Sequence, residues 1–232
     1  MGVPAVELKG ITKTFGSIVA NSDCSLTVEK GEILSVLGEN GSGKTTLMNM
    51  LAGIYFPDAG QIFVNGEEVV IRSPKDAFKY NIGMIHQHFK LVDVFTATEN
   101  IVLGMHDEEK FSLAEAEKKV RQITERYGFA VDLKKKIYEM SVSEKQTVEI
   151  IKVLYRGANI LILDEPFNAL DYKTYEDVKA IIRMLKAEGK TIFLTSHHYK
   201  DIEQLCDQVY SLEDCQLLPI TEEIAARYRE MD

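Results

Sequence analysis

The chain has 232 residues, of which 45% are hydrophobic and 27% charged, and its formal net charge at pH 7 is −9. These values are ordinary for a soluble globular protein and fit one domain with room for an inserted lobe. They disfavour a protein that coats nucleic acid, because phosphate contacts require clustered Lys and Arg. No apolar run approaches the roughly 20 residues of a membrane span, and the first ten residues lack the features of a signal peptide. Three scattered cysteines are typical of reduced thiols, so we expect a cytosolic protein.

The hydrophobic pattern changes its period along the chain and predicts an α/β fold with a helical insertion. Alternating residues and short apolar runs predict strands, in chain order, at 5–16, 17–32, 32–38, 60–69, 82–87, 159–166 and 191–197. The segment 60–69 is expected to be a hairpin, because Asn65-Gly66 is a favoured two-residue turn. Apolar spacing of about 3.6 predicts helices at 44–53, 112–129 and 175–190, within a generally helical stretch from 89 to 157.

Residues 38–45, GENGSGKT, fit the pattern G-x-x-x-x-G-K-[ST] between a predicted strand and a predicted helix. The glycines let the backbone curl so that amides of residues 41–45 point at phosphate oxygens, and the helix N-terminus adds partial positive charge. Lys44 can reach the β- and γ-phosphates, and the Thr45 hydroxyl can bind Mg²⁺. The alternative, a plain glycine-rich turn, does not explain the full pattern. The predicted nucleotide-binding residues of this phosphate loop are Gly38, Asn40, Gly41, Ser42, Gly43, Lys44, Thr45 and Thr46.

Two carboxylates, Asp164 and Glu165, end the apolar strand predicted at 159–166. A buried carboxylate is costly unless it is paired or binds a metal. Beside a phosphate loop, Asp164 can hold Mg²⁺ and Glu165 can polarise an attacking water. The alternative is a turn that closes the strand and caps the next helix, and the phosphate loop favours the catalytic interpretation over it.

These motifs occur in an order that resembles ABC-transporter ATP-binding subunits. In chain order they are the phosphate loop, Gln87, residues 140–146, LDEP at 163–166, NALD at 168–171 and SH at 196–197. The resemblance covers about residues 5–215 and is closest to importers of simple sugars and nucleosides. It implies a P-loop NTPase: a RecA-like core with a mainly parallel sheet, an N-terminal antiparallel β subdomain and an inserted α-helical subdomain. The implied parts are a nucleotide-binding core with the β subdomain (1–88 and 157–215), a helical signature subdomain (89–156) and a C-terminal tail (216–232).

The resemblance also implies roles for single residues. Phe15 matches the aromatic residue on which adenine stacks, the alternative being a core residue of a strand. Gln87 matches the glutamine that contacts Mg²⁺ and the attacking water, the alternative being a polar strand end. Asp171 matches an aspartate that couples two nucleotide sites across a dimer. His197, rather than His198, matches the histidine that senses the γ-phosphate.

The segment 139–150, EMSVSEKQTVEI, departs from the family's Leu-Ser-Gly-Gly-Gln signature. In the family, this segment opens a helix that faces ATP held by the other subunit, so Ser141 is implied to bind nucleotide in trans. Val142 and Ser143 replace the two glycines, and Ser143 is the departure that sugar importers do not share. Ser141-x-x-Glu144 is also a capping box, and we expect both roles to hold. Phe167 and Cys215 are further departures, at positions where threonine and a turn glycine are common.

The expected function is an ATP-binding and ATP-hydrolysing subunit, with ATP and Mg²⁺ as cofactors, that powers import of a sugar, nucleoside or similar solute. The implied partners are transmembrane permease subunits, a solute-binding protein, and a second ATP-binding domain in a homodimer or a homologous half. The chain would lie in the cytoplasm, peripheral on the inner face of the membrane, and it resembles the N-terminal half of a tandem protein. The alternative is an ATP-binding regulatory or structural subunit that hydrolyses weakly because of its altered signature. A DNA-repair ATPase would need a long coiled-coil insertion.

Overall fold

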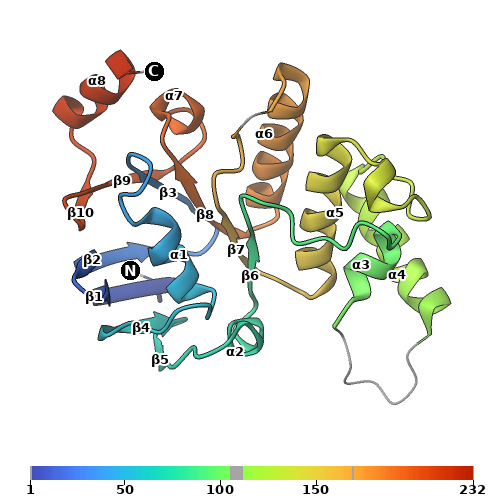
Figure 1. Cartoon of the computed structure of the whole chain (residues 1–232), viewed down its shortest axis with the longest axis horizontal. Helices are drawn as coiled ribbons and strands as arrows, with labels where there is room; N and C mark the ends of the chain where they lie inside the picture. Colours follow the sequence, from blue (N-terminus) through green and yellow to red (C-terminus); the bar gives the residue numbers. More distant parts are fainter. Residues whose placement is uncertain (1, 105–111, 169, 232) are drawn as a thin grey trace.

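Two β-sheets form the centre of the fold, and helices pack around them (Figure 1). The computed structural model describes residues 2–104, 112–168 and 170–231. The strands are β1 (Val6–Phe15), β2 (Ile18–Val28), β3 (Ile33–Leu37), β4 (Ala59–Val64), β5 (Glu67–Val69), β6 (Ile82–Ile85), β7 (Ile160–Leu163), β8 (Thr191–Ser196), β9 (Gln208–Glu213) and β10 (Gln216–Pro219). The helices are α1 (Lys44–Leu51), α2 (Pro74–Lys79), α3 (Ala97–Val102), α4 (Leu113–Tyr127), α5 (Val142–Tyr155), α6 (Tyr172–Ala187), α7 (Tyr199–Ile202) and α8 (Glu222–Met231), with a 3₁₀ turn, η1, at Ile137–Glu139.

The smaller sheet is antiparallel, with strand order β2-β1-β4-β5. The predicted hairpin of β4 and β5 is confirmed, and it turns at Asn65 and Gly66 with φ angles of 52° and 83°. Positive φ at both central residues is what the tight hairpin turn requires, and Asn-Gly adopts it with little strain. A local sequence signal therefore sets the register of this hairpin.

The larger sheet has strand order β10-β9-β3-β8-β7-β6, and every pairing in it is parallel except β9 with β10. All residues of β3, β7 and β8 are buried. Alternate residues of β7 face opposite sides, so that Ile160 and Ile162 pack with α1 and the smaller sheet, whereas Leu161 and Leu163 pack with α5 and α6. Burial on both faces explains why these strands are continuous apolar runs in the sequence.

A helical lobe follows β6 and carries its own apolar core. α3, α4, η1 and α5 surround it with, among others, Ala97, Ile101, Val120, Val148 and Ile151. In Figure 1 this lobe lies beside the β6 end of the larger sheet. None of the helices in the described ranges combines the length and the apolar character that a membrane span needs.

The C-terminal residues continue the fold beyond the expected boundary between residues 215 and 216, which falls inside the β9–β10 hairpin. α8 packs against α7 and the end of β3 through Ala225, Tyr228, Tyr199 and Leu37. The sequence pattern predicted neither α7 nor α8, nor the short α2. Helices of four to ten residues show few turns of apolar periodicity, and packing against the sheet stabilises them more than their intrinsic propensity does.

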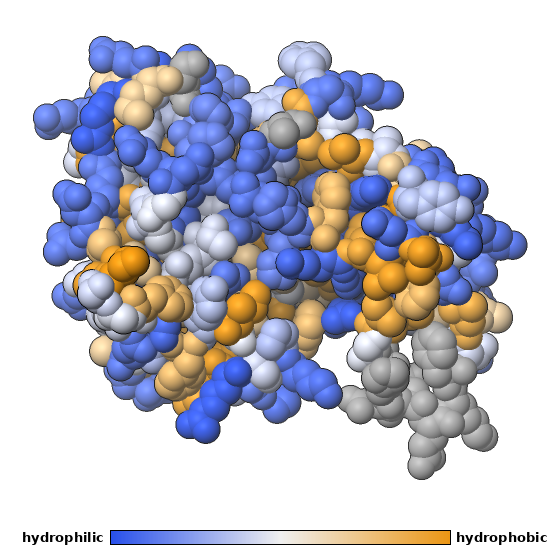
Figure 2. All heavy atoms as spheres, viewed as in Figure 1, coloured by the Kyte–Doolittle hydropathy of each residue, from blue (hydrophilic) through white to orange (hydrophobic). Residues whose placement is uncertain are grey.

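The parallel strands bring the predicted functional residues to one edge of the larger sheet, the edge formed by the carboxyl ends of the strands. The phosphate loop follows β3, Gln87 comes soon after β6, Asp164 follows β7 and His197 follows β8. In parallel sheets, ligands bind outside the carboxyl ends of the strands. On the face shown in Figure 2, hydrophilic residues predominate and apolar ones gather over the helical lobe.

Candidate nucleotide-binding site

A cavity of about 500 Å³ opens at the carboxyl end of the larger sheet. The phosphate loop, the β1–β2 hairpin and the β9–β10 turn form its walls. Of the residues that the sequence predicted, its lining includes Phe15, Asn40, Gly41, Ser42, Gly43, Lys44, Thr45, Thr46, Gln87 and Glu165. The lining residues that sequence reasoning missed are Ile18, Val19, Ala20, Asp214 and Cys215.

The backbone of the phosphate loop requires glycine at two positions, Gly38 and Gly43. A Cβ on Gly38 would lie 2.6 Å from Ser42 Oγ and 2.8 Å from Leu212 O. Gly43 has φ 105°, and a Cβ there would lie 2.3 Å from Ala20 O. These glycines let the loop close tightly under the N-terminus of α1, where its amides and the helix dipole favour an anion.

A polar atom without a partner supports this fit to phosphate. Ser42 Oγ is buried and has no hydrogen-bond partner among the described residues. A buried hydroxyl left unpaired is destabilising, and a phosphate oxygen would satisfy it. The loop therefore has the geometry and the donors that a nucleotide phosphate needs.

Lys44 is a buried cation at the centre of the site. Its side chain is 5% exposed, and its Nζ donates to Gly38 O (2.7 Å) and Glu39 O (3.0 Å). Nζ also lies 3.2 Å from Glu165 Oε1. A buried ammonium group needs such partners because it has lost its hydration.

Asp164 lies beneath the phosphate loop and is 3% exposed. Its Oδ1 accepts hydrogen bonds from Thr195 Oγ1 (2.7 Å) and Thr45 Oγ1 (3.1 Å). Burial raises the pKa of the Asp164 carboxyl above its ordinary value, and the two hydroxyl donors partly oppose this shift. A hydroxyl and a carboxylate are the hard oxygen ligands that Mg²⁺ prefers, so Thr45 and Asp164 fit the predicted metal site.

Glu165 is held between two nitrogen groups. Its Oε1 lies near Lys44, and its Oε2 is 2.8 Å from His197 Nδ1. The backbone of Glu165 has φ 49°, in the left-handed region that a non-glycine residue rarely adopts, and its N–H donates to Thr195 Oγ1 (2.9 Å). Local strain of this kind occurs where the surrounding structure fixes a functional side chain.

The remaining predicted residues separate into two groups. Phe15 lines the cavity and is 43% exposed, with its ring edge-on to Tyr55 at 5.2 Å between centroids, so the alternative that it is a core residue is wrong. Asp171 and Ser141 are the N-caps of α6 and α5, and neither belongs to the lining of this cavity. Their roles across a dimer stay predictions.

Cys215 is expected at a turn, but no sequence signal places it in the wall of this cavity. It and Asp214 form the β9–β10 turn with φ angles of 64° and 47°. The Cys215 thiol donates to Val19 O (2.9 Å), and its carbonyl accepts from Ser22 N–H (2.7 Å), which holds the turn against β2. The two segments are about 190 residues apart in the sequence, so no local pattern could predict their contact.

A sequence profile described as ABC transporter matches residues 21–168, more than half of the chain. The chain belongs to the ABC transporter family. Its curated relatives include the nucleoside import ATP-binding protein NupA of Lactococcus lactis (44% identical) and the guanosine import ATP-binding protein NupO of Bacillus subtilis (46%). The ribose import ATP-binding protein RbsA of Caldanaerobacter subterraneus is 39% identical. These alignments cover 88%, 88% and 91% of this chain but 41%, 40% and 43% of the relatives, so this ABC transporter chain spans about two fifths of their length.

Solved structures with a similar fold include ATP-binding components of ABC transporters. The ADP conformation of the ATP-binding cassette MJ1267 has a TM-score of 0.85 at 23% identity and covers 98% of both chains. CbiO1 of Clostridium perfringens has a TM-score of 0.81 at 24% identity, covering 98% of this chain and 92% of its own. At these identities the likeness shows the fold alone, and it confirms the predicted P-loop NTPase class.

Replacing Lys44 by alanine is expected to weaken ATP binding about tenfold or more. The lysine would make charge-assisted bonds to phosphate, each worth roughly 1.5–3 kcal/mol. Titration calorimetry with Mg-ATP measures the effect. Lys30→Ala, at an exposed turn lysine, is the matched control and should keep the affinity of the unmodified chain. Equal affinities of the two variants would contradict our placement of the phosphates.

Proposed function

We propose that this chain is an ATP-hydrolysing domain that powers import of a nucleoside, a sugar or a similar small solute. The observation that carries the proposal is the position of Glu165, which lies within ion-pair distance of Lys44 and within hydrogen-bonding distance of His197. The names of the curated relatives support import, and those relatives are about two and a half times as long as the stretch they share with this chain. The present chain would then be one half of a tandem protein or one of two paired subunits.

Thr45, Asp164 and Gln87 would hold Mg²⁺ beside the nucleotide. When bound, the ion would neutralise charge on the phosphates during transfer to water. Gln87 is exposed and lines the same cavity. Its position at the start of the segment after β6 would let it contact both the metal site and the water.

Glu165 would orient the attacking water and accept its proton. In the structure one of its carboxylate oxygens faces Lys44 and the other faces His197. A bound phosphate would attract the Lys44 ammonium group away from Glu165, because phosphate oxygens are strong charge-assisted acceptors. His197 would then be the remaining partner that holds the carboxylate in position for a proton transfer.

Two cassettes would enclose two ATP molecules, with Ser141 of one facing the phosphates held by the other. A dimeric cassette containing ADP and phosphate has a TM-score of 0.77 to this chain, at 24% identity, which supports the fold of each half. Ser143 occupies the second position of α5, whose first amides have no partner inside the helix. Those amides would complete the partner's phosphate site. The Cβ of Ser143 would leave less room than glycine does for a phosphate to approach them.

The altered signature is the one observation that favours the alternative, an ATP-binding subunit that regulates or braces a complex and hydrolyses little. The intact group of Lys44, Glu165 and His197 favours hydrolysis.

Permease subunits would dock on the helical lobe, and a solute-binding protein would complete the importer at the other side of the membrane. The described exposed apolar residues of the lobe include Val92, Val94, Leu103 and Leu113. Val92 and Val94 lie a few residues after Gln87, so a partner bound there would contact the segment that responds to nucleotide.

A permease partner should stimulate hydrolysis by the chain and protect these residues from labelling, and the absence of both effects would count against this arrangement. The chain would sit peripherally at the cytoplasmic face of the membrane.

Replacing Glu165 by glutamine is expected to slow ATP hydrolysis about 10²–10⁴-fold while ATP still binds. Glutamine keeps the shape of the side chain but cannot accept a proton. Steady-state phosphate release and nucleotide binding, measured on the same preparation, separate the two effects. Glu188→Gln, which alters a carboxylate paired with Arg126 away from the cavity, is the matched control. Equally slow turnover by the unmodified chain and Glu165→Gln would instead support the regulatory alternative.

Replacing Ser143 by glycine is expected to increase ATP-driven dimerisation and phosphate release by about tenfold to a hundredfold. The estimate corresponds to one recovered amide–phosphate bond of roughly 1.5–3 kcal/mol. Sedimentation with Mg-ATP measures the dimer, and phosphate release measures turnover. Lys145→Gly, on the same helix, controls for the general effect of glycine on α5. No gain over that control would mean that serine fully replaces glycine at position 143.

A further inference from the structure

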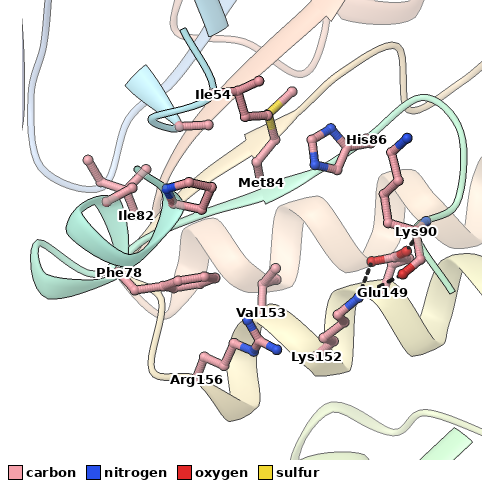
Figure 3. A pocket seen from close by; sticks show the side chains of 13 residues that line it. Ile54, Phe78, Ile82, Met84, His86, Lys90, Glu149, Lys152, Val153 and Arg156 are labelled. Carbon is pink, nitrogen blue, oxygen red and sulfur yellow. Dashed lines mark hydrogen bonds and ion pairs between the residues drawn. The ribbon is translucent and has the colours of Figure 1, made fainter. Parts of the chain in front are cut away.

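A second cavity, of about 160 Å³, lies between the core and the helical lobe. The strand β6 and the segment after it contribute Met84, His86 and Lys90, and α5 and its C-cap contribute Glu149, Lys152, Val153 and Arg156. Figure 3 shows Glu149 and Lys152 pointing from α5 towards Lys90. The wall of this cavity thus connects the segment that carries Gln87 to the helix that begins after Ser141.

Glu149 and Lys152 bind both polar groups of the Lys90 backbone. The Lys90 N–H donates to Glu149 Oε1 at 2.6 Å, and Lys152 Nζ donates to Lys90 O at 3.0 Å. Lys152 Nζ also lies 3.7 Å from Glu149 Oε2, which closes the arrangement (Figure 3). We refer to Glu149, Lys152 and the Lys90 backbone as the backbone clamp.

The clamp is buried where it joins the helix. The side chain of Glu149 is 3% exposed and that of Lys152 is 16% exposed. Burial lowers the pKa of the Lys152 ammonium group below its ordinary value, and the charge of Glu149 partly opposes this shift. Charge-assisted hydrogen bonds away from water are strong and directional, so the clamp fixes Lys90 relative to α5.

A second attachment lies two residues further along the segment. Asn100 on α3 accepts from Val92 N–H (2.7 Å) and donates to Val92 O (3.1 Å). Asn100 is 1% exposed. The lobe therefore holds the backbone of the segment at both Lys90 and Val92, through two helices.

The clamp lies close to both functional groups that it would connect. Gln87 is three residues before Lys90, and three residues of backbone span at most about 10 Å. Ser141 is eight residues before Glu149, which is about 12 Å along a helix. If Gln87 moves towards a bound nucleotide, only three residues of backbone separate it from the clamp. The movement would therefore be transmitted to α5 through Lys90.

We propose that Glu149 and Lys152 are positioning residues that set the place of the Ser141 end of α5 according to the position of Gln87. This inference rests on the proposed function, because it assigns the two residues to the coupling of one ATP site to the next. Neither residue would touch nucleotide or water. They would act through the Lys90 backbone and α5, so that nucleotide in one cavity presents Ser141 to the nucleotide of the partner.

Fluorescence of a single tryptophan tests the proposal. The chain has no tryptophan, and Tyr138, in η1 just before Ser141, is 58% exposed and suits a Tyr138→Trp reporter. In this reporter chain, a non-hydrolysable ATP analogue with Mg²⁺ should change the emission. Adding Glu149→Ala should abolish most of that change, because the clamp loses the acceptor of Lys90 N–H, while analogue affinity stays within about twofold.

Steady-state kinetics provides the second readout. Glu149→Ala should lower kcat for ATP about tenfold, as the loss of one charge-assisted bond felt in the transition state predicts, with KM nearly unchanged. Glu149→Gln should restore much of the emission change, since its amide oxygen can still accept from Lys90 N–H. If Glu149 only stabilised the fold, replacing it would lower the melting temperature but would not lower kcat selectively while KM stays unchanged.

Two further variants keep the experiment decisive. Glu117→Ala removes the carboxylate of a surface ion pair with Arg121 on the same lobe and should leave the emission change and kcat intact. If Glu149→Ala does not fold, the double variant Glu149→Leu, Lys152→Met removes both charges and both clamp bonds together, avoids an unpaired buried charge and should lose the emission change.

The outcomes distinguish this inference from the proposed function. An unmodified chain that neither binds nor hydrolyses ATP would overturn the proposed function itself. An unmodified chain that hydrolyses ATP, alongside Glu149 variants that match Glu117→Ala in emission change and kcat, would overturn the inference alone. A fall in kcat with a full emission change would also overturn it, because the effect would then bypass α5.

Discussion

The structure depends on one buried charge, the ammonium group of Lys44. An unpaired ammonium ion loses several kcal/mol of hydration when it is buried, even after the protein relaxes around it. The phosphate loop supplies two carbonyl oxygens and the end of β7 supplies Glu165, so the cation is surrounded by acceptors before any nucleotide arrives. Because those acceptors come from β3 and β7, the ion pair requires the two strands, with β8 between them, to end at matching heights.

β8 meets this requirement through one side chain. Thr195 donates its hydroxyl proton to Asp164 and accepts the N–H of Glu165, so a single buried hydroxyl holds both carboxylate residues. The parallel register pairs Leu37 with Ser196 and Leu163 with Leu194, which brings the residues after β3, β7 and β8 to the same edge. A shift of one residue would turn Thr195 to the opposite face and leave both carboxylates without this partner.

Local patterns predicted most of this arrangement, and contacts between distant segments account for the rest. Asn65-Gly66, the phosphate loop and Ser141-x-x-Glu144 are short signals whose geometry follows from their own residues, and the structure contains the hairpin, the tight loop and the capping box. The bond from Lys90 to Glu149 joins residues 59 positions apart, and the bond from Cys215 to Val19 joins residues 196 positions apart. Neither pair has a periodicity or motif that relates its members. Only the packing of the lobe and of the β9–β10 turn brings them together.

The two interpretations of Ser141 are compatible for a reason that lies in the hydroxyl group itself. Its oxygen accepts the Glu144 N–H at 3.3 Å, while Glu144 Oε2 accepts the Ser141 N–H at 2.8 Å. A hydroxyl group has one proton to donate besides the lone pairs with which it accepts, so the capping box leaves the Ser141 proton available for a phosphate oxygen. Lys135 pairs with Glu144 at 2.9 Å and so lowers the negative charge that the capping carboxylate places near an incoming phosphate. The capping box therefore orients the helix without consuming the donor that a partner's nucleotide would require, and the remaining differences from a glycine-containing signature are the side chains of Val142 and Ser143.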